Sequence, residues 1–113
     1  MTGKNYPRRD EVVWVNLDPT QGTETQKTRP GVVISSDSFN KNLSRVIVAP
    51  LTSNVKSVFD FQALVQVGEK KGKVMLDQIR TVDKTRLGKK IATLTDLEML
   101  SIERALKLTL ELV

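Results

Sequence analysis

The sequence predicts a small β-barrel or a strongly bent β-sheet with one helix packed on it. Short apolar runs recur at regular spacing between polar turns, which is typical of a chain of short strands. The clearest helical pattern comes last, from Thr95 to Val113. Because 113 residues suit one domain, we expect a single domain over residues 1–113, with a loose polar arm at 1–9.

The first half of the chain alternates apolar runs with polar segments. The first run carries Val12, Trp14 and Leu17 and is expected to be a strand. Pro50 lies near the end of another run. Proline cannot donate to a sheet ladder, so Pro50 favours a strand end or a sheet edge. The expected elements are a strand at 10–17, a loop at 18–30, a buried strand at 31–36, a helical turn at 36–40 and a strand at 45–51.

The second half continues the strand pattern. Apolar and polar residues alternate after Phe59, which indicates a half-buried strand. Gly68 and Gly72 bracket a polar turn of lysines and glutamate. The expected elements are a strand at 58–67, a turn at 68–72, a strand at 73–79, a helical turn at 83–86 and a short strand at 91–94.

The final helix has a recognisable start and an unusually wide apolar face. Thr95 and Glu98 have the spacing of a capping box, in which the Glu98 side chain reaches back to the Thr95 amide. A single packing face needs only one apolar stripe. Two explanations of the wider arc remain open: a partner subunit covers part of it, or the helix is buried more deeply in its own domain. The apolar residues are Leu97, Met99, Ile102, Ala105, Leu106, Leu108, Leu110, Leu112 and Val113.

Composition narrows the possible chemistry. A net charge of +5 and an isoelectric point near 9.7 favour an anionic partner, with RNA or DNA suiting the chain better than a membrane. The absence of cysteine and histidine excludes disulfides, thiolate metal sites and a histidine base. Acidic residues lack metal-loop spacing, so we expect neither a metal site nor a cofactor. No apolar run approaches membrane-spanning length and the first residues lack a signal-peptide core, so we expect a cytoplasmic protein.

The polar residues around the expected strands are the candidates for chemistry. Guanidinium groups suit bidentate phosphate contacts, and amides and hydroxyls can bond bases and phosphates. Structural alternatives stay open: Thr52 would bond its own turn, and Gln78 with Arg80 would form a solvated strand face. Lys70, Lys71 and Lys73, which lie beside Gly68 and Gly72, are interpreted as a solvated turn. The candidates are Glu24, Lys27 and Arg29, then Thr52, Ser53, Asn54 and Lys56, then Gln78 and Arg80.

Three segments together resemble the MazF/PemK toxins, the RNA-cleaving halves of bacterial toxin–antitoxin pairs. They read G-T-E-T-Q-K-T-R-P-G-V-V-I-S at 22–35, V-I-V-A-P-L-T-S at 46–53 and D-Q-I-R-T-V-D-K-T-R-L at 77–87. The resemblance extends over residues 10–113. It implies an SH3-like barrel, a homodimer and cleavage of single-stranded RNA at a short sequence without a metal ion. It also implies an antitoxin that lays an acidic, largely disordered tail across the same basic groove.

The resemblance also assigns roles to individual residues. Arg29 and Thr52 match the catalytic pair of these toxins, and Glu24 matches a loop residue at the RNA site. Because arginine is protonated in almost every protein environment, Glu24 is the better base on chemical grounds, whereas the resemblance gives Arg29 an acid/base role. The RNA groove of these toxins runs where this chain has Ser53, Asn54, Lys56, Gln78 and Arg80.

Two other functions remain possible at this level. A barrel of the same shape poisons DNA gyrase by protein contact in CcdB-type toxins, which need no Arg29/Thr52 pair. A non-catalytic RNA-binding module would bind RNA in a salt-dependent way without cutting it. The combination of the 22–35 segment with the two later segments favours the nuclease, because neither alternative requires it.

Overall fold

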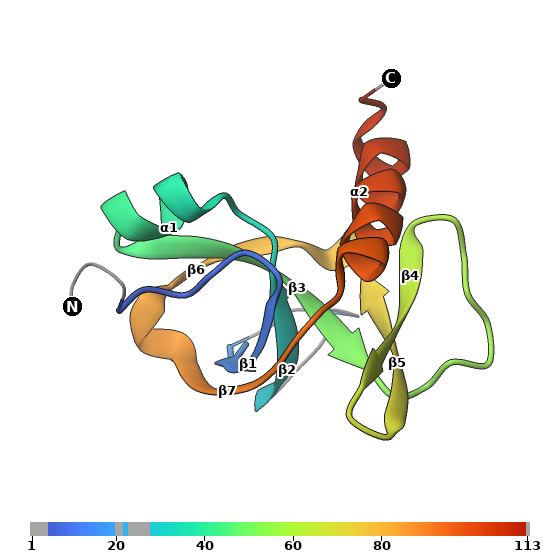
Figure 1. Cartoon of the computed structure of the whole chain (residues 1–113), viewed down its shortest axis with the longest axis horizontal. Coiled ribbons are helices and arrows are strands. Elements are labelled where there is room, and N and C mark those ends of the chain that lie inside the picture. Colours follow the sequence, from blue (N-terminus) through green and yellow to red (C-terminus); the bar gives the residue numbers. More distant parts are fainter. Residues whose placement is uncertain (1–4, 20–21, 23–27, 113) are drawn as a thin grey trace.

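The computed structural model describes residues 5–19, 22 and 28–112 (Figure 1). They form a mainly β structure with one long C-terminal helix. The strands are β1 (Glu11–Asn16), β2 (Thr28–Val33), β3 (Arg45–Thr52), β4 (Gln62–Val67), β5 (Lys70–Met75), β6 (Arg80–Asp83) and β7 (Leu87–Thr93). The helices are α1 (Asp37–Asn42) and α2 (Asp96–Leu110), with single 3₁₀ turns η2 (Leu76–Gln78) and η3 (Lys84–Arg86).

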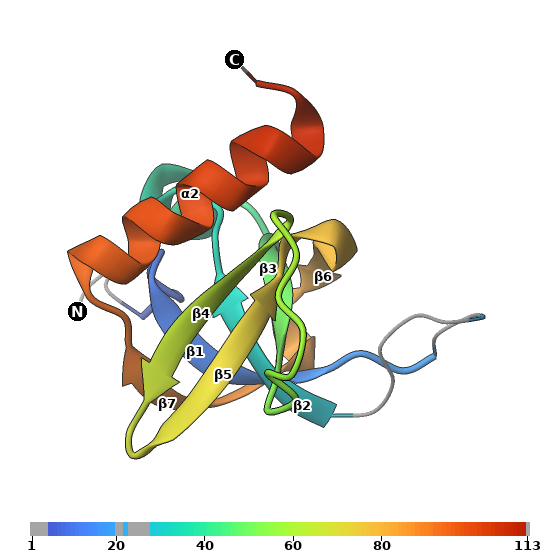
Figure 2. The same ribbon diagram turned by 90° about the vertical axis from the view of Figure 1, so that its right-hand side faces the viewer.

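The strands form one strongly curled antiparallel sheet in the order β4-β5-β3-β2-β1-β7, with β6 paired to β3. The β4–β5 hairpin turns away from the other strands, and α2 lies across it (Figure 2). The predicted bent sheet with a terminal helix packed on it is therefore confirmed. Neither helix of the described chain has the length and apolarity needed to cross a membrane.

The curl of the sheet produces two apolar cores. One lies between the sheet and α2, where Met99, Ile102 and Ala105 pack against residues of several strands such as Val32 and Val74. The other lies on the opposite face and is built mainly from valines of β1, β2, β3 and β6. Alternate residues of one strand therefore enter different cores, which explains why β1 and β3 are almost continuously apolar.

The central strand β3 corrects the expectation for Pro50. β3 pairs with β2 along one edge, while its other edge pairs first with β6, through Val48, and then with β5, from Leu51 onward. Pro50 thus lies inside the sheet and not at its edge, where the partner on one side changes from β6 to β5. A residue without an N–H is tolerated at such an interruption of the ladder.

Several strand boundaries also differ from the expected ones. β2 begins at Thr28, three residues before the expected strand, because it pairs with β1 from Asn16 onward. β4 begins only at Gln62. The expected turn at 68–72 shrinks to a tight connection after Val67, with Gly68 at φ +62°, so Lys70 to Gly72 belong to β5. β5 ends before η2, β6 was not predicted, and β7 begins at Leu87 and not at Ile91.

The end of the N-terminal segment is bonded to the rest of the molecule. Arg9 donates from its backbone to Asp37, from Nε to the Ile34 carbonyl and from Nη2 to Glu103 at 2.6 Å. These contacts tie the entry to β1 to α1 and α2. Residues 1–4 of the expected loose arm lie outside the described part of the chain.

The helix α2 has the predicted capping box and buries only one side. The Thr95 hydroxyl accepts from the Glu98 amide, and the Glu98 carboxylate accepts from the Thr95 amide. Ile102 is only 1% exposed, whereas Leu97 and Leu100 are 78% and 59% exposed. Of the two explanations for the wide apolar arc, deeper burial in the same domain is therefore wrong.

The loss of stability as pH falls below about 5 should depend on Glu98. Burial raises the pKa of this carboxyl, but hydrogen bonds from the Thr95 and Gln66 amides and the Thr95 hydroxyl outweigh burial and lower its pKa below the usual 4.5. A depressed pKa contributes stability above the unfolded-state value, and this contribution is lost as pH falls through the folded-state value. We expect the melting temperature of Glu98→Gln, measured by circular dichroism, to fall less steeply between about pH 5 and pH 3 than that of the wild type. Glu69→Gln, in the exposed β4–β5 turn, should show the same fall of melting temperature with pH as the wild type. The same fall in Glu98→Gln would contradict a contribution of Glu98 to the pH dependence of stability.

Candidate active site

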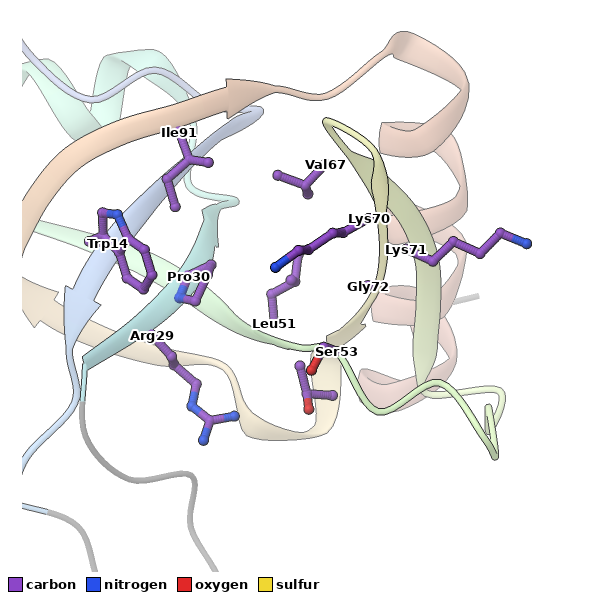
Figure 3. Close-up of a pocket in the computed structure, with 11 residues that line it drawn as sticks. Trp14, Arg29, Pro30, Leu51, Ser53, Val67, Lys70, Lys71, Gly72 and Ile91 are labelled. Atoms are coloured by element: carbon purple, nitrogen blue, oxygen red, sulfur yellow. The ribbon is translucent and has the colours of Figure 1, made fainter.

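A pocket opens where the β4–β5 hairpin diverges from β1, β2 and β7. It has a volume of about 530 Å³ and an apolar floor with cationic and hydroxyl groups around it (Figure 3). Because the ends of the sheet curl toward each other without pairing in the described strands, side chains from six strands (β1, β2, β3, β4, β5 and β7) meet here. The lining residues are Trp14, Arg29, Pro30, Leu51, Thr52, Ser53, Val67, Lys70, Lys71, Gly72 and Ile91.

Arg29 reaches this pocket from a strand and not from a loop. It lies near the start of β2, directly opposite Val15 of β1, and Pro30 follows it within the strand. Proline restricts its own φ and pushes the preceding residue toward extended geometry, which fits both positions to β2. The guanidinium group points to the mouth of the pocket, on the same side as Ser53 (Figure 3). A partly buried arginine on a rigid strand is well placed to meet an anion.

Thr52 also lines the pocket, as the last residue of β3, the strand that pairs with β2. Its hydroxyl oxygen accepts a hydrogen bond from the Asn54 amide at 3.3 Å. The structural alternative for this residue, a bond to its own turn, is therefore present in the structure. A hydroxyl that accepts one bond still carries a proton to donate, so this bond is compatible with a contact between Thr52 and a ligand oxygen.

The segment after β3 carries three further candidates. Ser53 lines the pocket, while Asn54 and Lys56 are exposed. The Asn54 side chain accepts from the Lys56 amide at 3.3 Å, so successive local bonds shape this segment. The structure thus brings Arg29, Thr52 and Ser53 to one pocket, with Asn54 and Lys56 beside it.

The last two candidates, Gln78 and Arg80, do not line this pocket. Arg80 donates from Nη1 to the Leu17 carbonyl at 2.9 Å, and Gln78 lies 3.6 Å from the Met75 sulfur. Arg86 makes a similar contact, donating to the Asn16 and Asp18 carbonyls. Arg80 and Arg86 therefore anchor the chain where it leaves β1. Glu24 and Lys27 lie outside the described residues.

Sequence reasoning missed two residues of the pocket. Lys70 was interpreted as part of a solvated turn, but it lies on β5 and its ammonium group points into the pocket, whereas Lys71 points away (Figure 3). Trp14 was expected only as a strand residue, yet it is 42% exposed and forms one wall. A large aromatic residue exposed between buried valines is a signal that becomes visible only once the inward-facing positions of β1 are known.

The electrostatics of the pocket favour an anion. Arg29, Lys70 and Lys71 line it, and among the described residues no acidic side chain belongs to the lining. Basic groups around an apolar floor suit a ligand that combines phosphates with flat apolar surfaces. Among the described residues, no cluster of three or more acidic side chains is arranged to hold a metal ion.

Comparison with known proteins points to one family. The model of the PemK-like, MazF-like toxins of type II toxin–antitoxin systems matches residues 8–110. The chain is 35% identical to Endoribonuclease MazF9 of Mycobacterium tuberculosis over 114 aligned residues, covering 93% of this chain and 97% of that protein.

Solved structures share the fold. The crystal structure of MazF from Deinococcus radiodurans superposes with a TM-score of 0.83 at 25% identity, covering 94% of this chain and 97% of that one. An endoribonuclease from Mycobacterial species, solved in complex with its cognate antitoxin, gives a TM-score of 0.80 at 23% identity, covering 95% and 97% of the two chains.

Proposed function

The chain belongs to the PemK-like, MazF-like toxins of type II toxin–antitoxin systems, and we propose that it is an endoribonuclease that cuts single-stranded RNA at a short sequence without a metal ion. The observation that carries this proposal is the meeting of Arg29, Thr52 and Ser53 at one cationic pocket. The relative from M. tuberculosis is named an endoribonuclease, which supports the same activity here.

The chemistry requires little from the protein besides orientation and charge. The ribose 2′-oxygen attacks the adjacent phosphorus, the bond from phosphorus to the 5′-oxygen breaks, and a 2′,3′-cyclic phosphate and a 5′-hydroxyl result. A base takes the 2′-hydroxyl proton and an acid protonates the leaving 5′-oxygen. Arg29 stabilises the charge of the phosphorane, and Thr52 donates a hydrogen bond to a phosphate oxygen. Glu24 is our candidate for the base. Because the nucleophile is the 2′-hydroxyl, DNA is not cut.

The pocket floor offers a place for a base next to the scissile phosphate. Unstacked bases of single-stranded RNA commonly stack on aromatic side chains, and Trp14 presents such a surface beside Arg29. The ammonium group of Lys70 is available for a base edge or a phosphate (Figure 3). Lys27, Asn54, Lys56, Gln78 and Arg80 are our candidates for contacts to the rest of the RNA.

The proposal includes two protein partners and a location. An acidic antitoxin tail would occupy the same basic pocket, in keeping with the antitoxin-bound relative. A homodimer would cover apolar side chains that α2 leaves exposed, including Leu97 and Leu100. We expect the toxin to act in the cytoplasm, where cutting messenger RNA would stop translation and growth.

Digestion of a long single-stranded RNA in excess EDTA tests this function. We expect discrete fragments with 2′,3′-cyclic phosphate and 5′-hydroxyl ends, identified by end mapping, and no cleavage of a DNA of the same sequence. A folded, antitoxin-free sample that leaves the RNA intact would contradict the proposal. RNA binding without cleavage would then favour the binding module, and inhibition of DNA gyrase would favour the gyrase poison.

A further inference from the structure

We infer that Lys73 is a positioning residue for RNA binding, which fastens the segment 53–57 beside Thr52 through the Ser57 carbonyl. This inference rests on the proposed function, because the segment carries Ser53, Asn54 and Lys56. It assigns a role to a charged side chain that neither the pocket lining nor the cleavage chemistry uses.

The environment of Lys73 requires an explanation. Its residue is only 8% exposed, although lysine is almost never buried unless its ammonium group is paired. Nζ donates to the Ser57 carbonyl oxygen at 2.7 Å, a short bond strengthened by the charge of the donor. Lys73 is thus not the solvated turn residue that the sequence suggested.

The position of Lys73 relates this bond to the candidate site. In the β3–β5 pair, Lys73 lies directly opposite Thr52. The chain leaves the sheet at Thr52, and the segment 53–61 then bulges outward before it enters β4 (Figure 1). At Ser57 it meets the Lys73 ammonium group. Lys73 therefore contacts the chain at both ends of the segment 53–57. Its backbone pairs with Thr52, just before the segment, and its side chain bonds Ser57, at the end of it.

The hydrogen bonds inside the segment 53–57 are longer than the bond from Lys73 to the Ser57 carbonyl. The Asn54 and Lys56 amides donate to Thr52 and Asn54 at 3.3 Å each, near the long end for a hydrogen bond. Without the Lys73 ammonium group, the segment would sample more conformations, and binding RNA would have to order it. Thr52 keeps its backbone pairing in β3, so the loss should fall on RNA binding more than on the cleavage step.

The test compares Lys73→Met with the wild type on a short RNA that contains the mapped cleavage site. We expect KM to rise about tenfold and kcat to change less than about threefold, since a charge-assisted bond is lost but the reacting groups remain. Lys73→Arg, which keeps a cationic donor, should have a KM close to that of the wild type. Lys41→Met, on exposed α1 near the start of β3 (Figure 1), removes the same charge far from the pocket and should match the wild type.

Amide hydrogen exchange provides the second readout. We expect faster exchange at residues 53–57 in Lys73→Met, with β2 and α2 unchanged. If Lys73→Met is not folded at the assay temperature, Lys73→Gln, which keeps a neutral donor, takes its place. A KM equal to that of the wild type, or kcat and KM effects that only follow a lost folded fraction, would overturn the inference. Intact RNA with the wild type would contradict the proposed nuclease; unaltered exchange at 53–57 would contradict the role of Lys73 whether or not RNA is cut.

Discussion

Replacing Arg29 with alanine is expected to lower kcat/KM for RNA by about a thousandfold, because the proposed mechanism uses the guanidinium group of this pocket residue to stabilise the phosphorane charge. Arg29 lies on β2 with its side chain at the pocket mouth and not in either apolar core, so the variant should fold. Initial rates on a fluorogenic RNA in EDTA measure the effect, and circular dichroism and sedimentation check the fold and oligomeric state.

Two further variants make this result specific. Arg45→Ala removes an exposed arginine at the opposite end of β3 from Thr52, and it should retain wild-type activity. Arg29→Lys keeps the charge but loses the planar fork of donors, so its activity should lie between those of Arg29→Ala and the wild type. Cleavage by Arg29→Ala at a rate comparable to the wild type would mean that Arg29 is not catalytic. Growth inhibition that persists without RNA cleavage would favour the gyrase-poison alternative.

Ile102→Asp should have the largest effect on stability. Ile102 is almost fully buried between α2 and the sheet, and a carboxylate there would have no partner. Burying an unpaired charge, together with losing the apolar side chain, typically costs more than about 3 kcal/mol. That is a large part of the 5–15 kcal/mol that stabilises a small domain. We expect a melting transition that is lost or lowered by more than about 10 °C, measured by circular dichroism.

Leu100→Asp is the matched control on the same helix, since Leu100 is largely exposed. Unlike Ile102→Asp it should keep a cooperative folding transition, and its sedimentation tests whether the exposed leucines of α2 form the contact between two copies. A shift to a more slowly sedimenting species would show that the exposed leucines of α2 form the dimer contact. An unchanged dimer would show that the two copies contact each other through another surface. A wild-type melting curve for Ile102→Asp would remove α2 from the folding core.

Local patterns of the sequence determined much of this protein. Alternating and continuous apolar runs predicted every strand except β6, the Thr95/Glu98 spacing predicted the start of α2, and Ser36 caps the short helix expected near it. The three segments around Arg29 and Thr52 predicted the family. The strand and helix signals are readable because each depends on residues within a turn or two of one another.

The tertiary structure decided what depends on partners far away in the chain. β2 begins at Thr28 because β1 is there to pair with it, which moves Arg29 from a loop to a strand. Pairing across the β4–β5 hairpin extends β5 to Lys70, and the curl of the sheet brings this lysine and Trp14 to the same pocket. Lys73 looked like its neighbours in the sequence, but the segment after β3 covers it. Burial and pairing of this kind arise from long-range contacts, so no local pattern of residues carries them.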